Sequence, residues 1–155
     1  MDFVVSKVAM SICALMVVAI LGGVFNEGAF LDVNNELENI VDDFCSVADM
    51  IALAGAESSI SWLVPFSSDG DPVSIKIDGI LVRAESGSES AVSQPVSPVR
   101  TWRYDGRSMN ATQLAEMDAT VNVLKARSGQ SITLESRMVS VDNQNRMFVF
   151  ASCQV

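Results

Sequence analysis

The sequence predicts an α+β fold in which one long N-terminal helix packs on an antiparallel β-sheet head that carries one short helix. Three observations support it: an uncharged apolar run near the N-terminus, a helical repeat of apolar residues after it, and short alternating segments beyond. They divide the 155 residues into the apolar half of the helix (1–25), its amphipathic continuation (26–55) and the β-rich head (56–155).

The first half of the predicted helix is apolar on every side. Residues 8–25 read VAMSICALMVVAILGGVF, without a charge, and as a helix they would span about 27 Å, just enough to cross a bilayer. Lys7 precedes this run and acidic residues follow it, so the positive-inside rule predicts a single membrane pass with a cytoplasmic N-terminus. A cleaved signal peptide is the alternative, but Asp2 offsets Lys7 and no small-x-small cleavage site is evident, which favours a retained anchor.

The second half is apolar on one face only. Its apolar residues are spaced alternately by three and four, which is typical of an amphipathic helix: Phe30, Val33, Leu37, Ile40, Phe44, Val47 and Ile51. Carboxylates such as Asp42 and Asp43 lie on the other face, where we expect them to be solvated. The stripe predicts packing against the head, and bundling of its first part with other copies of the chain remains an alternative.

The head shows two hairpin signals and one helical pattern. Alternating residues flank Asp78-Gly79, and a second alternating pair flanks the DNQN segment at residues 142–145, so each predicts a hairpin. Residues 110–129 predict an amphipathic helix that ends at Gly129, and the Ser-rich segment 85–98 predicts a surface loop.

Composition excludes several classes of function. The net charge is −9, from 19 acidic and 10 basic residues, and no basic stripe is visible along the sequence, so we predict no nucleic-acid partner. The chain has no histidine, which excludes His-dependent triads and His-ligated metals. No phosphate-binding glycine loop or carboxylate cluster with ligand spacing is present either. We therefore predict no enzyme, no cofactor and no metal site.

Candidate sites in the head come from isolated motifs. Asn110-Ala111-Thr112 fits the N-glycosylation sequon, with helix capping as the alternative role of Asn110. Cys45 and Cys153 would meet oxidising conditions outside the cell, but spacing alone does not show whether they form a disulfide. Trp102 lies between Arg100 and Arg103, which suits either a cation-π surface for a sugar or partner or ordinary packing in the sheet.

The segment SKVAMSICALMVVAILGGVF, followed by ELENIVDDFCSVADMIALA and a β-leaning head, resembles a type IV pilin-like subunit of archaea or bacteria. In that family the apolar helix first anchors the precursor in the membrane and then forms the core of a filament. The resemblance implies a structural subunit of a cell-surface filament that contacts membrane lipid before assembly and self-associates afterwards, together with filament-machinery proteins. The assembly residues would be Val8, Ile12, Leu15, Val18, Ala19 and Leu21, continued by the stripe from Phe30 to Ile40.

Another class of protein fits the same pattern. A single-pass, membrane-tethered ectodomain, such as a filament accessory protein or one that binds a surface layer or partner, would also join an apolar anchor to a β-rich head. A secreted or anchored enzyme is the third alternative.

Overall fold

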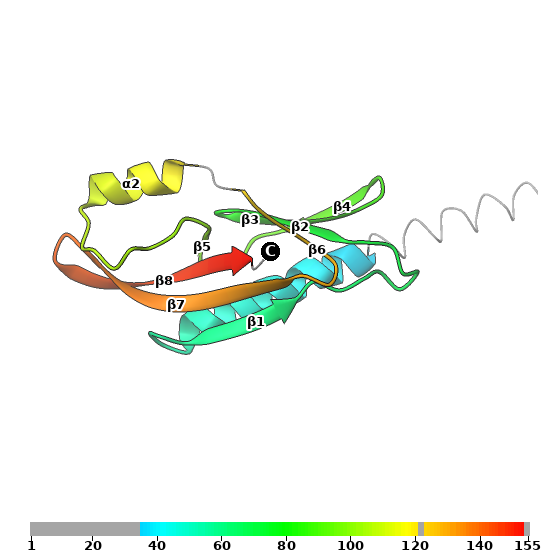
Figure 1. The fold of residues 1–155 in the computed structure, drawn as a ribbon, viewed down its shortest axis with the longest axis horizontal. Helices are drawn as coiled ribbons and strands as arrows, with labels where there is room; N and C mark the ends of the chain where they lie inside the picture. Colours follow the sequence, from blue (N-terminus) through cyan, green and yellow to red (C-terminus); the bar gives the residue numbers. More distant parts are fainter. Residues whose placement is uncertain (1–34, 121–122, 154–155) are drawn as a thin grey trace, which may run out of the picture. The chain divides into compact units, whose positions relative to one another are not determined.

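The computed structural model describes residues 35–120 and 123–153, nearly all within one compact unit that begins at Glu36. Its strands form two four-stranded sheets, which we call the first sheet (β1-β7-β8-β5) and the second sheet (β4-β3-β2-β6) (Figure 1). A helix over residues 35–53, called helix 35–53 below, precedes them, and α2 (Ala111–Ala119) lies between β5 and β6. The strands are β1 (Ser59–Leu63), β2 (Ser74–Asp78), β3 (Leu81–Ser86), β4 (Glu89–Ser93), β5 (Val99–Arg100), β6 (Leu124–Arg127), β7 (Ser131–Val141) and β8 (Gln144–Cys153).

The predicted fold class is wrong. The described residues form a mainly β structure of two sheets with two short helices, instead of one sheet under a long helix. Helix 35–53 has about 19 residues, and the predicted anchor at residues 1–25 lies outside the described residues. Within the part that the structure describes, no helix is both long and apolar enough to cross a membrane.

Helix 35–53 packs into the interior through a wide apolar face. Seven of its side chains are buried: Leu37, Ile40, Val41, Phe44, Cys45, Ala48 and Ile51. This face is broader than the predicted stripe, and such a width is typical of a helix facing a globular core. The Phe44 ring meets Trp62 of β1 edge-on at 5.1 Å between centroids, and Asp42 accepts a hydrogen bond from Ser93 of β4. The helix therefore contacts both sheets.

The first sheet buries one face at one end of its long strands and the opposite face at the other end. In β7, Ile132, Leu134 and Ser136 are buried, and then the pattern shifts by one residue to Val139 and Val141. Because successive side chains of a strand point to opposite faces, the two halves of β7 bury opposite faces of the sheet. Val139 and Val141 belong to a second core with Trp102 and Phe150, against which residues of α2 pack.

Both predicted hairpins are confirmed. In β2–β3 the pairing of Asp78 with Leu81 leaves Gly79 and Ile80 as the loop, one residue later than predicted, and Gly79 has φ 66°. In β7–β8 the loop is Asp142-Asn143, with φ 51° and 62°. Positive φ at both loop residues suits the right-handed twist of the paired strands, and Asn and Asp adopt it more readily than other side chains.

Two other predictions are wrong because strand pairing outweighs local composition. The predicted loop 85–98 contains β4, which pairs with β3 through Ala91 and Ala84 on the buried face. The predicted helix 110–129 ends at Ala119, since Thr120 adopts an extended conformation, and residues 124–127 form β6 beside β2.

We expect Phe44→Ala to destabilise the fold by about 3–5 kcal/mol, because it removes a fully buried ring and leaves a cavity beside Trp62. Met50→Ala is the matched control on the same helix, where the side chain is 58% exposed, and it should cost less than about 0.5 kcal/mol. Urea unfolding of the full chain in detergent, followed by tryptophan fluorescence, measures both changes. Equal effects would contradict the packing described.

Candidate functional site

The predicted assembly residues fall into two groups. Val8, Ile12, Leu15, Val18, Ala19 and Leu21, together with Phe30 and Val33 of the stripe, lie outside the described residues. The rest of the stripe is described: Leu37, Ile40, Phe44 and Ile51 are buried, and Val47 is half-buried. Because the chain itself covers these side chains, the stripe from Leu37 onward is occupied by intramolecular packing.

Carboxylates of helix 35–53 bond to the head, so they do not form the purely solvated face that we predicted. Asp43 accepts a hydrogen bond from the Trp62 indole at 2.8 Å. Asp49 accepts from the backbone N–H groups of Val96 and Ser97 at 3.2 and 3.0 Å. Glu36 accepts from the backbone N–H of Ser68 at 2.6 Å and from its hydroxyl at 3.0 Å. Charge-assisted hydrogen bonds of this kind fix the orientation of the helix on both sides of its buried face.

Trp102 does not form the exposed cation-π surface that the sequence allowed. Its side chain is 6% exposed, and its indole N–H donates to Asp118 of α2 at 2.8 Å. The same carboxylate accepts two hydrogen bonds from Arg100, both 2.9 Å long, and the Arg100 guanidinium lies over Phe148, 4.0 Å from the ring centroid. The packing role is therefore correct, and Asp118 ties α2 to the first sheet.

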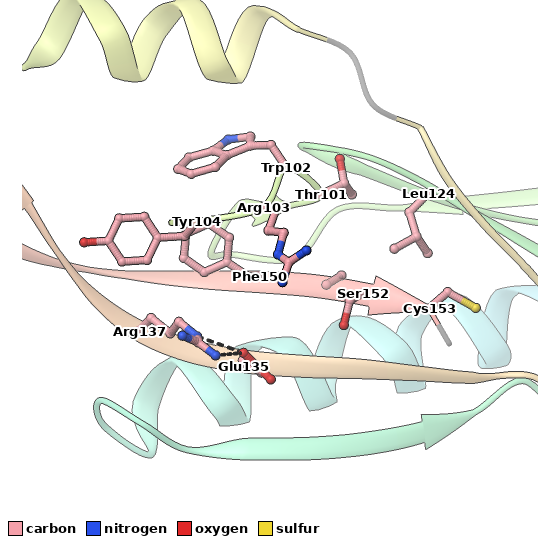
Figure 2. Close-up of a pocket in the computed structure, with 11 residues that line it drawn as sticks. Thr101, Trp102, Arg103, Tyr104, Leu124, Glu135, Arg137, Phe150, Ser152 and Cys153 are labelled. Atoms are coloured by element: carbon pink, nitrogen blue, oxygen red, sulfur yellow. Dashed lines mark hydrogen bonds and ion pairs between the residues drawn. The ribbon is translucent and has the colours of Figure 1, made fainter. Parts of the chain in front are cut away.

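A groove of about 610 Å³ lies beside this cluster, a volume within the ordinary range of ligand sites (Figure 2). One part is aromatic: Tyr104 stacks on Phe150 with 5.9 Å between ring centroids. Another part is polar, where Arg137 and Glu135 of β7 form an ion pair at 2.6 Å. Arg103 also lines the groove and reaches into it in Figure 2. Aromatic side chains beside charged groups can contact both the apolar and the polar parts of a ligand such as a sugar.

Asn110 performs the capping role that the sequence left open. Its side-chain oxygen accepts a hydrogen bond from the Gln113 N–H at 2.8 Å, and the Gln113 side chain accepts from the Asn110 N–H at 2.9 Å. This capping box begins α2. Asn110 is exposed, and the cap uses the amide oxygen, whereas a glycan would attach to the amide nitrogen. Capping and glycosylation are therefore compatible, and glycosylation stays a prediction.

Cys45 and Cys153 are not joined by a disulfide in the structure. Burial raises the pKa of the Cys45 thiol above its ordinary value, and the negative charges of Asp42 and Asp49 raise it further, whereas a hydrogen bond with Ser93 lowers it. Since the thiolate is the reactive form, this environment lowers the reactivity of Cys45. Among the described residues, no group of three or more Cys, Asp or Glu side chains is arranged to hold a metal ion.

No known protein-family model, curated protein or solved structure matches this chain.

We expect Asp118→Asn to destabilise the fold by about 1–3 kcal/mol, because Arg100, whose side chain is 14% exposed, would lose the carboxylate with which it forms an ion pair. Asp105→Asn is the control: Asp105 and Arg107 are both well exposed, and such pairs contribute about 0–1 kcal/mol. Thermal unfolding of the two variants measures the difference. An Asp118→Asn variant as stable as the control would show that this carboxylate does not tie α2 to the sheet.

We expect iodoacetamide to alkylate Cys45 more than about tenfold more slowly in the folded chain than in urea at pH 8. The raised pKa lowers the thiolate fraction at every pH below it, and burial blocks the reagent. Peptide mass spectrometry after timed quenching follows Cys45 separately from the other two cysteines. Equal rates in the folded and unfolded chain would mean that the thiol is accessible.

Proposed function

We propose that the chain is a structural subunit of a type IV pilus-like cell-surface filament. Residues 1–25 would anchor it in the membrane before assembly and pack in the filament core afterwards, with the head outside the cell. The single observation that carries this proposal is that helix 35–53 is packed into the head through a wide buried face. This helix begins ten residues after the end of an uncharged apolar run.

A rigid joint between apolar run and head is what a filament subunit requires, because its position in the filament is set through that segment. Residues 26–34, which separate the apolar run from helix 35–53, read NEGAFLDVN. Beyond them, the buried side chains and the carboxylates of helix 35–53 hold it to both sheets. A domain that is only tethered to the membrane does not require its first helix to be held by both sheets.

The apolar run suits two environments in turn. Side chains such as Leu15 and Val18 are stable in lipid, and they also suit a close-packed bundle of helices from several copies. In water, the run would leave a large apolar surface exposed to solvent. Lipid before assembly and sister copies after it are therefore the proposed partners of this segment.

The groove beside Trp102 supports a second candidate, a membrane-tethered ectodomain that binds a partner or surface layer. Its volume and its mixture of aromatic and charged side chains suit a ligand. This candidate predicts that membranes contain the chain as monomers and that filaments sheared from the surface contain none of it.

For the filament proposal we expect Leu15→Arg to abolish surface filaments, because a charge within the run is costly in lipid and in a helical bundle alike. Val96→Arg, at an 89% exposed position of the head, is the control and should leave filaments in place. Electron microscopy of cells and mass spectrometry of sheared material provide the measurement. Normal filaments from the Leu15→Arg variant, with the chain present in them, would refute the role of this segment.

A further inference from the structure

The second sheet carries a row of cations on its outer face. Lys76 of β2 is paired in register with Arg83 of β3 on one side and with Lys125 of β6 on the other. Arg127, two residues further along β6, lies on the same face. The residues that alternate with them, including Ile75 and Ala126, are buried, so these cations face away from the core. We call these four residues the basic row.

Few carboxylates neutralise the basic row. Like charges directly opposite each other on neighbouring strands repel. Glu85 bonds to Lys76 at 2.6 Å and lies 4.0 Å from Arg83, but the ion pairs among the described residues include none for Lys125 or Arg127. In a chain of net charge −9, this gathering of positive charge on one face suits an acidic partner.

The chain carries a surface of opposite sign on helix 35–53. Glu38 and Asp42 are exposed and lie one helical turn apart. A groove of about 540 Å³ continues from Asp42 to Met50 and Leu53. We call the surface formed by these four residues the acidic helix face. Met50 and Leu53 are exposed apolar side chains, and so are Leu81 and Val92 on the outer face of the second sheet. Charge and apolar surface are therefore present on both sides of a prospective contact.

The two surfaces lie on opposite sides of the second sheet. Ser93 of β4 contacts Asp42 and shares its side of the strand with buried Ala91, so helix 35–53 lies against the inner face. The basic row lies on the outer face and cannot reach the helix of the same molecule. It can reach the helix of another copy. A contact between two different surfaces of identical subunits continues from copy to copy, and it forms an open helical chain where the rotation between copies does not close a ring.

We propose that the basic row of one copy docks on the acidic helix face of the next copy, as a head-to-tail contact between heads. This inference rests on the proposed filament function, and it identifies the contact that sets the register of neighbouring subunits outside the apolar core. Exposed charge pairs are screened by salt, so the contact should weaken as ionic strength rises.

A carbodiimide tests the contact, because it joins an amine to a carboxylate only where the two touch. The sequence has three lysines, Lys7, Lys76 and Lys125, and both of those in the described residues belong to the basic row. Treatment of intact cells should give a ladder of linked copies, with Lys125 joined to Glu38 or Asp42 in the peptide spectra. The Lys76–Glu85 pair within one molecule reports that the reagent has reacted.

Charge reversal gives the decisive comparison. A sheet variant, Arg83→Glu with Lys125→Glu, and a helix variant, Glu38→Lys with Asp42→Lys, should each lose the ladder when expressed alone. Expressed together they should regain it, because each variant then offers the surface that the other lacks. Arg107→Glu with Arg146→Glu, on exposed residues outside the second sheet, makes the same charge change as the sheet variant and should keep the ladder.

The outcomes separate this inference from the proposed function. A ladder that survives in the sheet variant, or one that co-expression does not restore, would overturn the contact even if filaments form normally. Lysines linked only to other cell-surface molecules would overturn it in favour of a different anionic partner. A ladder restored by co-expression, in cells whose filaments lack this chain, would support the contact and refute the filament role.

Discussion

The structure depends on the burial of one helix face between two sheets. Phe44 and Leu37 are fully buried on helix 35–53, and they meet a core to which the first sheet contributes Ile132 and the second sheet Ile75. Complete burial of one such side chain is worth about 1.5–3 kcal/mol, which is an upper estimate because unfolded chains already bury some surface. The helix is thus the element through which both sheets share one core, and the second core around Trp102 is built on the opposite face of the same first sheet.

Burial of the apolar face holds the helix against the sheets, but it only weakly fixes the rotation of the helix about its axis and its position along that axis. The carboxylates fix both, because a hydrogen bond acts only over a narrow range of distance and angle. Asp43 reaches the first sheet at Trp62, whereas Asp49 reaches the loop after β4, on the side of the second sheet. A helix held in this way transmits a force applied at its N-terminal end to both sheets, which is the mechanical property that the filament proposal requires.

Sequence patterns predicted those features that depend on neighbouring residues. The Asp142-Asn143 loop and the apolar repeat of the helix are local signals, and both hairpins and the helix through residues 35–53 are present. The strand β4 was missed because its serine-rich sequence becomes a strand only through pairing with β3. The basic row was missed for a related reason. Lys76, Arg83 and Lys125 are up to 49 residues apart in the sequence, and only the register of three strands brings them together.

The basic row also explains how a chain with a large negative net charge could associate with other copies of itself. A uniform charge of −9 would make copies repel one another, yet a separation of the charges onto two faces makes one relative orientation favourable. Exposed charge pairs contribute more to specificity and to the rate of encounter than to affinity. In the proposed filament the two contacts therefore differ in role: the apolar segment at residues 8–25 provides the affinity, and the opposed charges of the heads select the register in which the copies pack.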